Sequence, residues 1–170
     1  MSKGLKGFQL SKVKSWIVVL GILVYGFCMV VIPAILESDA ENHAQEYNEY
    51  RLSIFPLLQE QDNLIMKWDK SNDKHSIEFV NDFQAIEDKM KAIQPEDERL
   101  RLMHAPLIVR SQLLTESLEK LHNAENPDNP EFFAKEVEPL LAKAKHQLDL
   151  FVSHKNSYMK AHNLVEEKEQ

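Results

Sequence analysis

The sequence predicts an all-α protein in which a single N-terminal transmembrane helix precedes an antiparallel four-helix bundle with one short helix. Three observations support this fold class. An uncharged run extends from Trp16 to Leu36, apolar side chains then recur at intervals of three and four residues, and no glycine follows Gly26. The first feature is typical of a membrane span, the second indicates amphipathic helices, and the third argues against tight β-hairpins.

The run from Trp16 to Leu36 matches a lipid bilayer in length. As a helix it would extend for about 31 Å, the thickness of the hydrocarbon core. Four lysines and no acidic residue precede it, whereas three acidic residues follow it before residue 42. By the positive-inside rule, we expect a basic cytoplasmic tail at residues 1–15, the transmembrane helix at 16–36 and an extracytoplasmic domain at 37–170. The predicted location is the cell (inner) membrane, with the N-terminus in the cytoplasm.

A cleaved signal peptide is the alternative interpretation of this run, because Ser38 and Ala40 are small residues at the spacing that signal peptidases prefer. The apolar core of a signal peptide is usually about 7–15 residues long, so the longer run favours a retained anchor. Cys28 lies inside the run, and we interpret it as an apolar packing residue. Because it is the only cysteine, the domain that follows has no disulfide and no thiolate metal site.

The segment after the predicted span is strongly acidic. Residues 37–170 contain all 27 acidic residues and 16 of the 20 basic ones, which leaves a net charge of about −11. Such a charge repels nucleic acid and anionic lipid head groups, so neither is expected to bind this domain. The lack of glycine also disfavours phosphate-binding loops and nucleophile elbows, which depend on positive φ.

Apolar periodicity predicts two helices in the first half of the domain. The first extends from about Ser38 to Lys70 and the second from about Lys74 to Ile93. The second helix has a narrow apolar stripe, with side chains spaced by four and three residues, formed by Phe79, Phe83, Ile86, Met90 and Ile93. A stripe of this width packs against one neighbour.

Two further helices are predicted in the second half. The third is expected to begin at Pro95, because proline suits the first helical position and the acidic residues at 96–98 suit the positive end of the helix dipole. A loop at residues 123–129 ends it. Asn129 and Pro130 then form the cap and first turn of the fourth helix, which is expected to continue to about Val165.

Short connections favour antiparallel neighbours, so we expect the four helices to form an up-down-up-down bundle in which the second is the short member. Prolines inside the predicted helices should produce kinks or short breaks at Pro56, Pro106 and Pro139. Kinks of this kind either let long helices curve around a core or frame a ligand pocket, and we favour curvature.

The third predicted helix has more apolar surface than one bundle face needs. Leucines recur every seven residues from Leu100 to Leu121 and form the expected core stripe. A second apolar arc lies about 140° away, with Arg110 between the two sets. Either this helix is the most buried one and its arginines extend outward, or the second arc is an interface. The interface candidates are Leu102, Val109, Leu113 and Arg110.

Neither a metal site nor a catalytic site is predicted. Glu119 and His122 form an E-x-x-H motif of the kind that di-iron bundles repeat, but it occurs once, and helical periodicity places both residues opposite the leucine stripe. The sequence has no recognisable set of nucleophile, base and oxyanion donors. We therefore expect no metal, no cofactor and no enzymatic activity.

The expected function is that of a membrane-anchored, non-enzymatic interaction or scaffold protein, such as an accessory subunit of an envelope complex. Its partners would be the bilayer, through Trp16–Leu36, and an envelope protein or a second copy of the chain. The alternative is an extracytoplasmic sensor or holdase-like bundle that binds a small molecule or client between kinked helices. By architecture alone, the bundle resembles the external sensing domains of membrane chemoreceptors, although residues 130–170 contain no second span.

Overall fold

A computed structural model describes the backbone of residues 32–164 and the side chains of residues 41–164. The chain divides into two units, Met1–His43 and Ala44–Gln170, and the second contains the helical bundle. No helix within the described residues is both long and apolar enough to cross a membrane. The predicted tail and most of the predicted span, residues 1–31, lie outside the described part.

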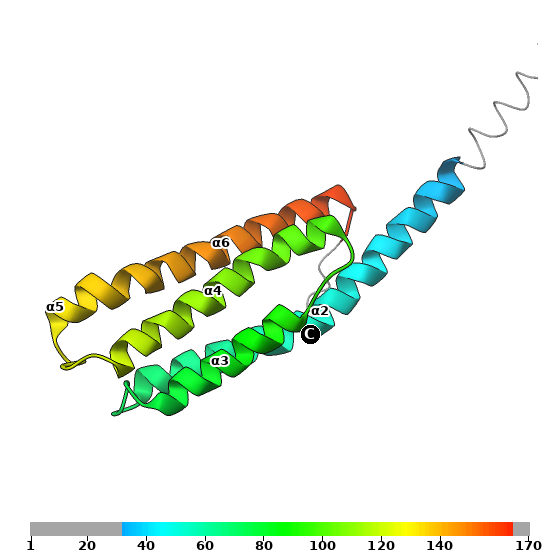
Figure 1. The fold of residues 1–170 in the computed structure, drawn as a ribbon. Coiled ribbons are helices and arrows are strands. Elements are labelled where there is room, and N and C mark those ends of the chain that lie inside the picture. The colour runs from blue at the N-terminus through cyan, green and yellow to red at the C-terminus, as the bar shows by residue number, and fades with distance from the viewer. Residues whose placement is uncertain (1–31, 165–170) are drawn as a thin grey trace, which may run out of the picture. The chain divides into compact units, whose positions relative to one another are not determined.

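Helix α2, Ile32–Lys70, is the longest element (Figure 1). It begins before the predicted start at Ser38 and ends at the predicted Lys70, where the Ser71 N–H donates to the Trp68 carbonyl at 3.1 Å. Pro56 lies inside the helix, which continues through it. Of the kink or short break expected at Pro56, the break does not occur, because one lost hydrogen bond does not end a helix that packs along much of its length.

Helix α3, Ile77–Ala92, is the short member of the bundle, as predicted. It starts three residues later than the expected Lys74, because the Ser76 side chain caps it by accepting a hydrogen bond from the Glu78 N–H at 3.3 Å. Ile93 adopts an extended conformation and ends the helix.

Helix α4, Glu98–His122, also starts later than predicted. Asp97, and not Pro95, sets its beginning, because the Asp97 carboxylate accepts the Leu100 N–H at 2.8 Å. An acidic side chain at this position both caps the helix and suits its dipole. Pro106 is buried inside α4 without interrupting it, so of the kink or short break expected there the break does not occur either.

The fourth predicted helix is built from α5 (Pro130–Phe132), the π-helical turn η2 (Phe133–Val137) and α6 (Glu138–Ala161). Asn129 caps it as predicted, accepting the Glu131 N–H at 2.9 Å. The wide turn explains how the chain accommodates Pro139: the Glu138 N–H donates to the Phe133 carbonyl, and the helix resumes with proline in its first turn. This confirms the irregularity expected at Pro139.

The end of α6 falls short of the predicted Val165. Asn163 has a left-handed backbone with φ of 53°, and the Leu164 N–H donates to the Met159 carbonyl at 2.9 Å. This is the pattern of a Schellman motif, in which one left-handed residue lets the chain satisfy the last carbonyls of a helix.

The helices run up and down in turn, with α4 lying between α3 and α6 (Figure 1). Side-chain contacts tie α2 to the other three: Glu60 pairs with Lys89 of α3, Gln61 bonds Ser111 of α4, and Tyr47 stacks on Tyr158 of α6. The all-α bundle expected from the sequence is thereby confirmed for the described residues.

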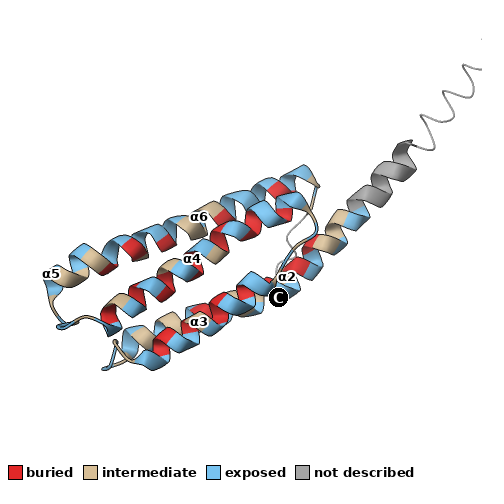
Figure 2. Ribbon diagram, viewed as in Figure 1, coloured by how far each residue is buried: buried red, intermediate tan, exposed pale blue. Residues whose placement is uncertain are grey.

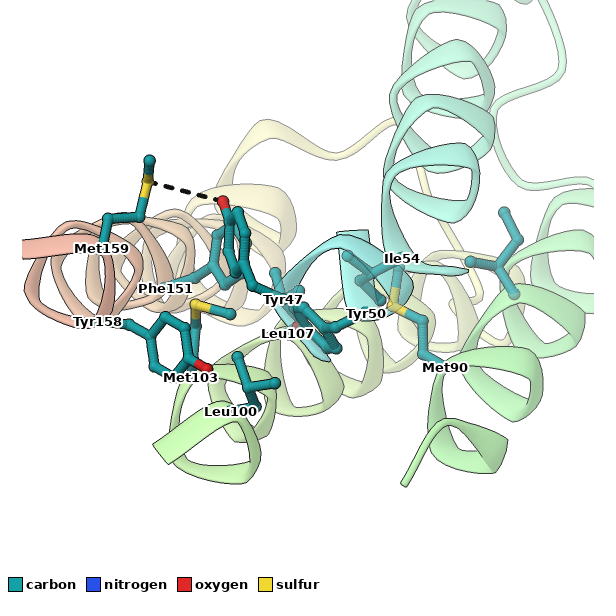
Figure 3. Close-up of a cluster of buried hydrophobic side chains, with 11 residues drawn as sticks. Tyr47, Tyr50, Ile54, Met90, Leu100, Met103, Leu107, Phe151, Tyr158 and Met159 are labelled. Carbon is teal, nitrogen blue, oxygen red and sulfur yellow. Dashed lines mark hydrogen bonds between the residues drawn. The ribbon is translucent and has the colours of Figure 1, made fainter. Parts of the chain in front are cut away.

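The core consists of two clusters, and the buried side chains form stripes along the inner faces of the helices (Figure 2). The first cluster contains Tyr47 and Ile54 of α2, Met90 of α3, Leu107 of α4 and Phe151 of α6, so all four helices contribute side chains to it (Figure 3). The second cluster contains Phe79, Val80, Phe83, Leu114, Leu118, Leu121, Val137 and Ala144. The heptad leucines of α4 supply both clusters, as predicted.

Candidate interaction surface

The second apolar arc of α4 is only partly exposed. Leu102 and Val109 point to solvent, with 57% and 38% of their surface accessible. Leu113, the third member, is half-buried and packs against the second core cluster. The structure therefore leaves two of the three apolar candidates on the surface and gives the third a role in the core.

An open groove of about 320 Å³ lies beside Leu102, between α4 and α6. Its lining combines an apolar floor with polar edges and consists of Arg99, Leu102, His154, Ser157, Tyr158 and Ala161. Burial, with a smaller contribution from the Asp97 charge, raises the pKa of Tyr158 to about 12, so this phenol stays protonated at neutral pH. A groove of this kind offers an apolar contact with a few polar groups that fix orientation.

Arg110, the fourth interface candidate, is not on the surface. Its guanidinium is buried, where it donates to the Gln61 side-chain carbonyl and, at 3.0 Å, to the Asp62 carboxylate. The expectation that the arginines of α4 extend outward was wrong for Arg110. A buried cation is tolerated because charged and polar acceptors compensate for lost hydration, and α2 supplies both acceptors here.

The polar contacts continue from Arg110 across the bundle. The Gln61 amide donates to the Ser111 hydroxyl at 2.7 Å, and that hydroxyl lies 3.1 Å from the Met90 sulfur. These contacts join α2, α4 and α3 at one level between the two apolar clusters. Part of this layer could have been found in the sequence, since Gln61 lies among the apolar positions of its helix.

His104 is a second buried polar group that sequence reasoning missed. Its ring is 3% exposed and lies 3.1 Å from the Tyr50 hydroxyl and 2.9 Å from the Met90 carbonyl. Burial lowers the pKa of His104, and the hydrogen bond to Met90 opposes this shift. The available signal was its place in α4, directly after the core residue Met103.

An acidic cleft of about 500 Å³ opens beside Tyr50, where α3 connects to α4. Four carboxylates line it, from Glu46, Glu49, Glu96 and Asp97. The cleft also contains the residues that follow the C-terminus of α3, the negative end of that helix dipole. Its electrostatic character is therefore anionic.

The interior holds little space for a ligand. A largely enclosed cavity of about 40 Å³ lies in the second core cluster, between Trp68, Phe83, Leu118 and Val137. A cavity of about 150 Å³ is what a benzene-sized molecule needs. This cavity is therefore too small for such a ligand.

The E-x-x-H pair lies on the exposed surface of α4, as helical periodicity predicted. His122 is held by the loop before α3, its Nδ1 2.9 Å from the His75 carbonyl. Since a carbonyl only accepts, Nδ1 carries the proton and cannot also bind a metal ion in this arrangement. The backbone carbonyl of Glu119 accepts a hydrogen bond from the Asn123 side-chain amide at 2.8 Å.

Comparison with known proteins adds no assignment: no protein family, curated protein or solved structure matches the chain. Fold and site therefore define the class only as an all-α helical bundle.

Proposed function

We propose that the chain is a membrane-anchored, non-enzymatic interaction protein, and that its bundle contacts an envelope protein or a second copy through the outer face of α4. The observation that carries this proposal is the exposure of Leu102 and Val109 on a helix whose other apolar residues are largely buried. Contiguous apolar patches are typical of contact surfaces, and Leu102 also lines the open groove between α4 and α6.

The interior of the bundle also favours contact over ligand binding. The first core cluster packs side chains from all four helices, and the cavity in the second cluster measures about 40 Å³. A sensor that encloses a small molecule would need several times that volume. The acidic cleft of about 500 Å³ is the feature that keeps the sensor as a second candidate, with a cationic ligand as its occupant.

The membrane anchor belongs to this proposal and rests on the sequence. The run from Trp16 to Leu36 is long enough to span a bilayer, and the lysines before it orient the bundle outside the cytoplasm. Protease added to cells with a permeabilised outer envelope should digest the bundle and leave the tail protected. Complete protection of the bundle would reverse the orientation, and a mature chain that starts near Glu41 would show cleavage.

The contact surface can be tested with a matched pair of variants. Leu102→Gln combined with Val109→Gln should abolish co-purification of the partner or second copy while helical circular dichroism stays unchanged. Leu52→Gln is the control, because it makes the same replacement of an exposed apolar side chain by glutamine on another helix, α2, where Leu52 is 71% exposed. An equal loss of binding in the control would show that the effect is not specific to the outer face of α4. Unfolding of the double variant would show that Leu102 and Val109 belong to the core.

A further inference from the structure

His104 connects three helices at the corner where α3 ends. The ring belongs to α4, its Nδ1 lies 3.1 Å from the Tyr50 hydroxyl of α2, and its Nε2 lies 2.9 Å from the Met90 carbonyl of α3. The Tyr50 ring meets the imidazole edge-on, with centroids 5.6 Å apart. Each of these contacts depends on the position of the same ring.

The hydrogen-bond partners of the His104 ring determine its protonation state and tautomer. The Met90 carbonyl can only accept, so Nε2 must carry a proton and donate. Nδ1 can then accept from the Tyr50 hydroxyl if the imidazole is neutral. A second proton on Nδ1 would remove the acceptor for the hydrogen bond that the Tyr50 hydroxyl donates. The resulting imidazolium would also be a buried charge whose two hydrogen-bond partners are uncharged.

The same Met90 carbonyl also ends α3. It accepts the Ile93 N–H at 3.1 Å, and Ile93 begins the connection to α4. Ile93, Pro95 and Tyr50 line the acidic cleft, which is open to solvent. A proton can therefore approach this corner through the cleft.

The charged groups around this corner are arranged to favour a proton once the corner opens. On α2 and the connection, the cleft carries the carboxylates of Glu46, Glu49, Glu96 and Asp97, with Tyr47 buried behind them. On α3, the buried Glu87 is paired with Lys91, and on α4 the Arg110 cation is held by Gln61 and Asp62. On α6, Tyr158 contributes a neutral phenol.

We propose that His104 is an acid-sensitive latch: as a neutral ring it fastens the end of α3 to α2 and α4, and on protonation it releases the connection 93–97 and opens this corner of the bundle. The released imidazolium would then lie beside the carboxylates of the cleft. This inference does not depend on the proposed interaction function, since it concerns the bundle alone.

The direction of the pH effect follows from the burial of the ring. Burial places the pKa of His104 below its ordinary value of 6.5. The folded state therefore binds the proton less tightly than the unfolded state does, and unfolding takes up a proton at mildly acidic pH. The contribution of His104 to stability is complete above pH 6.5 and is lost as the pH falls from there toward the folded-state pKa.

The test compares the full-length chain in detergent with a His104→Gln variant, because glutamine can still donate and accept but does not titrate. Chemical denaturation between pH 8 and pH 5 should show that the native chain takes up as much as one more proton on unfolding than the variant does. His146→Gln, which alters an exposed histidine of α6, is the matched control and should follow the native curve. The protection of the amides at Met90–Ile93, measured relative to their intrinsic exchange rate at each pH, should fall on acidification before that of Phe83 does.

Parallel stability curves for the native chain and His104→Gln would overturn the proposal. If the variant does not fold, proton NMR of the native chain decides instead. A His104 ring that titrates below the exposed histidines, together with early exchange at the end of α3, supports the latch. A His104 ring that titrates with or above the exposed histidines contradicts it.

Discussion

Gln61 is fully buried, yet its side chain accepts from Arg110 and donates to Ser111 at 2.7 Å. Asp62, the next residue, holds the other end of the same guanidinium at 3.0 Å. Two consecutive residues of α2 thus determine where the one buried arginine of the described α4 points. This layer sets the register of α2 on α4, because a shift by one residue would leave the cation without acceptors.

We predict that Gln61→Leu lowers the free energy of unfolding by about 1.5–3 kcal/mol, because it removes a hydrogen bond to a charged group and leaves Arg110 with one acceptor. Urea denaturation measures this loss. In combination with Arg110→Met, the total loss should be smaller than the sum of the two single losses, since the second substitution removes the uncompensated charge. Strict additivity would show that the two side chains do not depend on each other.

The two arcs of α4 should differ sharply in their sensitivity to substitution. Leu107 is fully buried in the first core cluster, so Leu107→Ala should cost about 2–5 kcal/mol. Leu102→Ala removes a similar number of atoms from the surface and should change stability by less than about 0.5 kcal/mol. Equal losses measured by denaturation would mean that Leu102 belongs to the core, which would weaken the proposed contact surface.

At the scale of the helices, the N-terminal caps explain which boundaries were predictable. Asn129 is followed by proline, which leaves one choice of cap, and the structure confirms it. Before α4, three consecutive acidic residues can each serve as a cap or first-turn residue, and the structure selects Asp97. Before α3, Ser76 caps the helix, whereas the periodicity of the apolar stripe gives no sharp start.

We expect Asn129→Ala to cost about 1 kcal/mol, within the usual range of about 0.5–2 kcal/mol for a lost cap. The Asn129 side chain accepts the Glu131 N–H at 2.9 Å, and alanine cannot replace that acceptor. Asn129→Asp keeps the acceptor and should retain most of the stability. Asn126→Ala alters the same loop away from the cap and serves as the control in thermal or urea unfolding; a comparable loss there would point to the loop and not the cap.

The candidate site was less predictable than the helices, for a physical reason. A helical projection gives the direction of a side chain from its own axis but not which neighbour will meet it. Arg110 and Leu113 lie at the border of the two arcs, so their environment depends on where α2 and η2 pack. The acceptors for Arg110, the buried Gln61 and the exposed Asp62, come from a helix about 50 residues earlier, which no local pattern of α4 contains.

At the scale of the whole molecule, the proposed anchor and the helical bundle can be tested separately. The proposed anchor and its orientation depend on the sequence from residue 1 to 36, most of which lies outside the described residues. The bundle and its contact surface depend on the described residues, where the core is packed and Leu102 remains exposed. If the prediction of a membrane anchor is wrong, the expected location of the protein changes, but the proposed contact surface of the bundle does not.

The most direct test of the central claim, that the bundle is an interaction module, is native mass measurement of the full-length chain purified in a mild detergent. We predict a complex, in which a second copy or another protein accompanies the chain and is lost from the variant that combines Leu102→Gln with Val109→Gln. A monomer that retains a small molecule would contradict the claim and favour the sensor, with the acidic cleft as the site to examine. A monomer with nothing bound would contradict both.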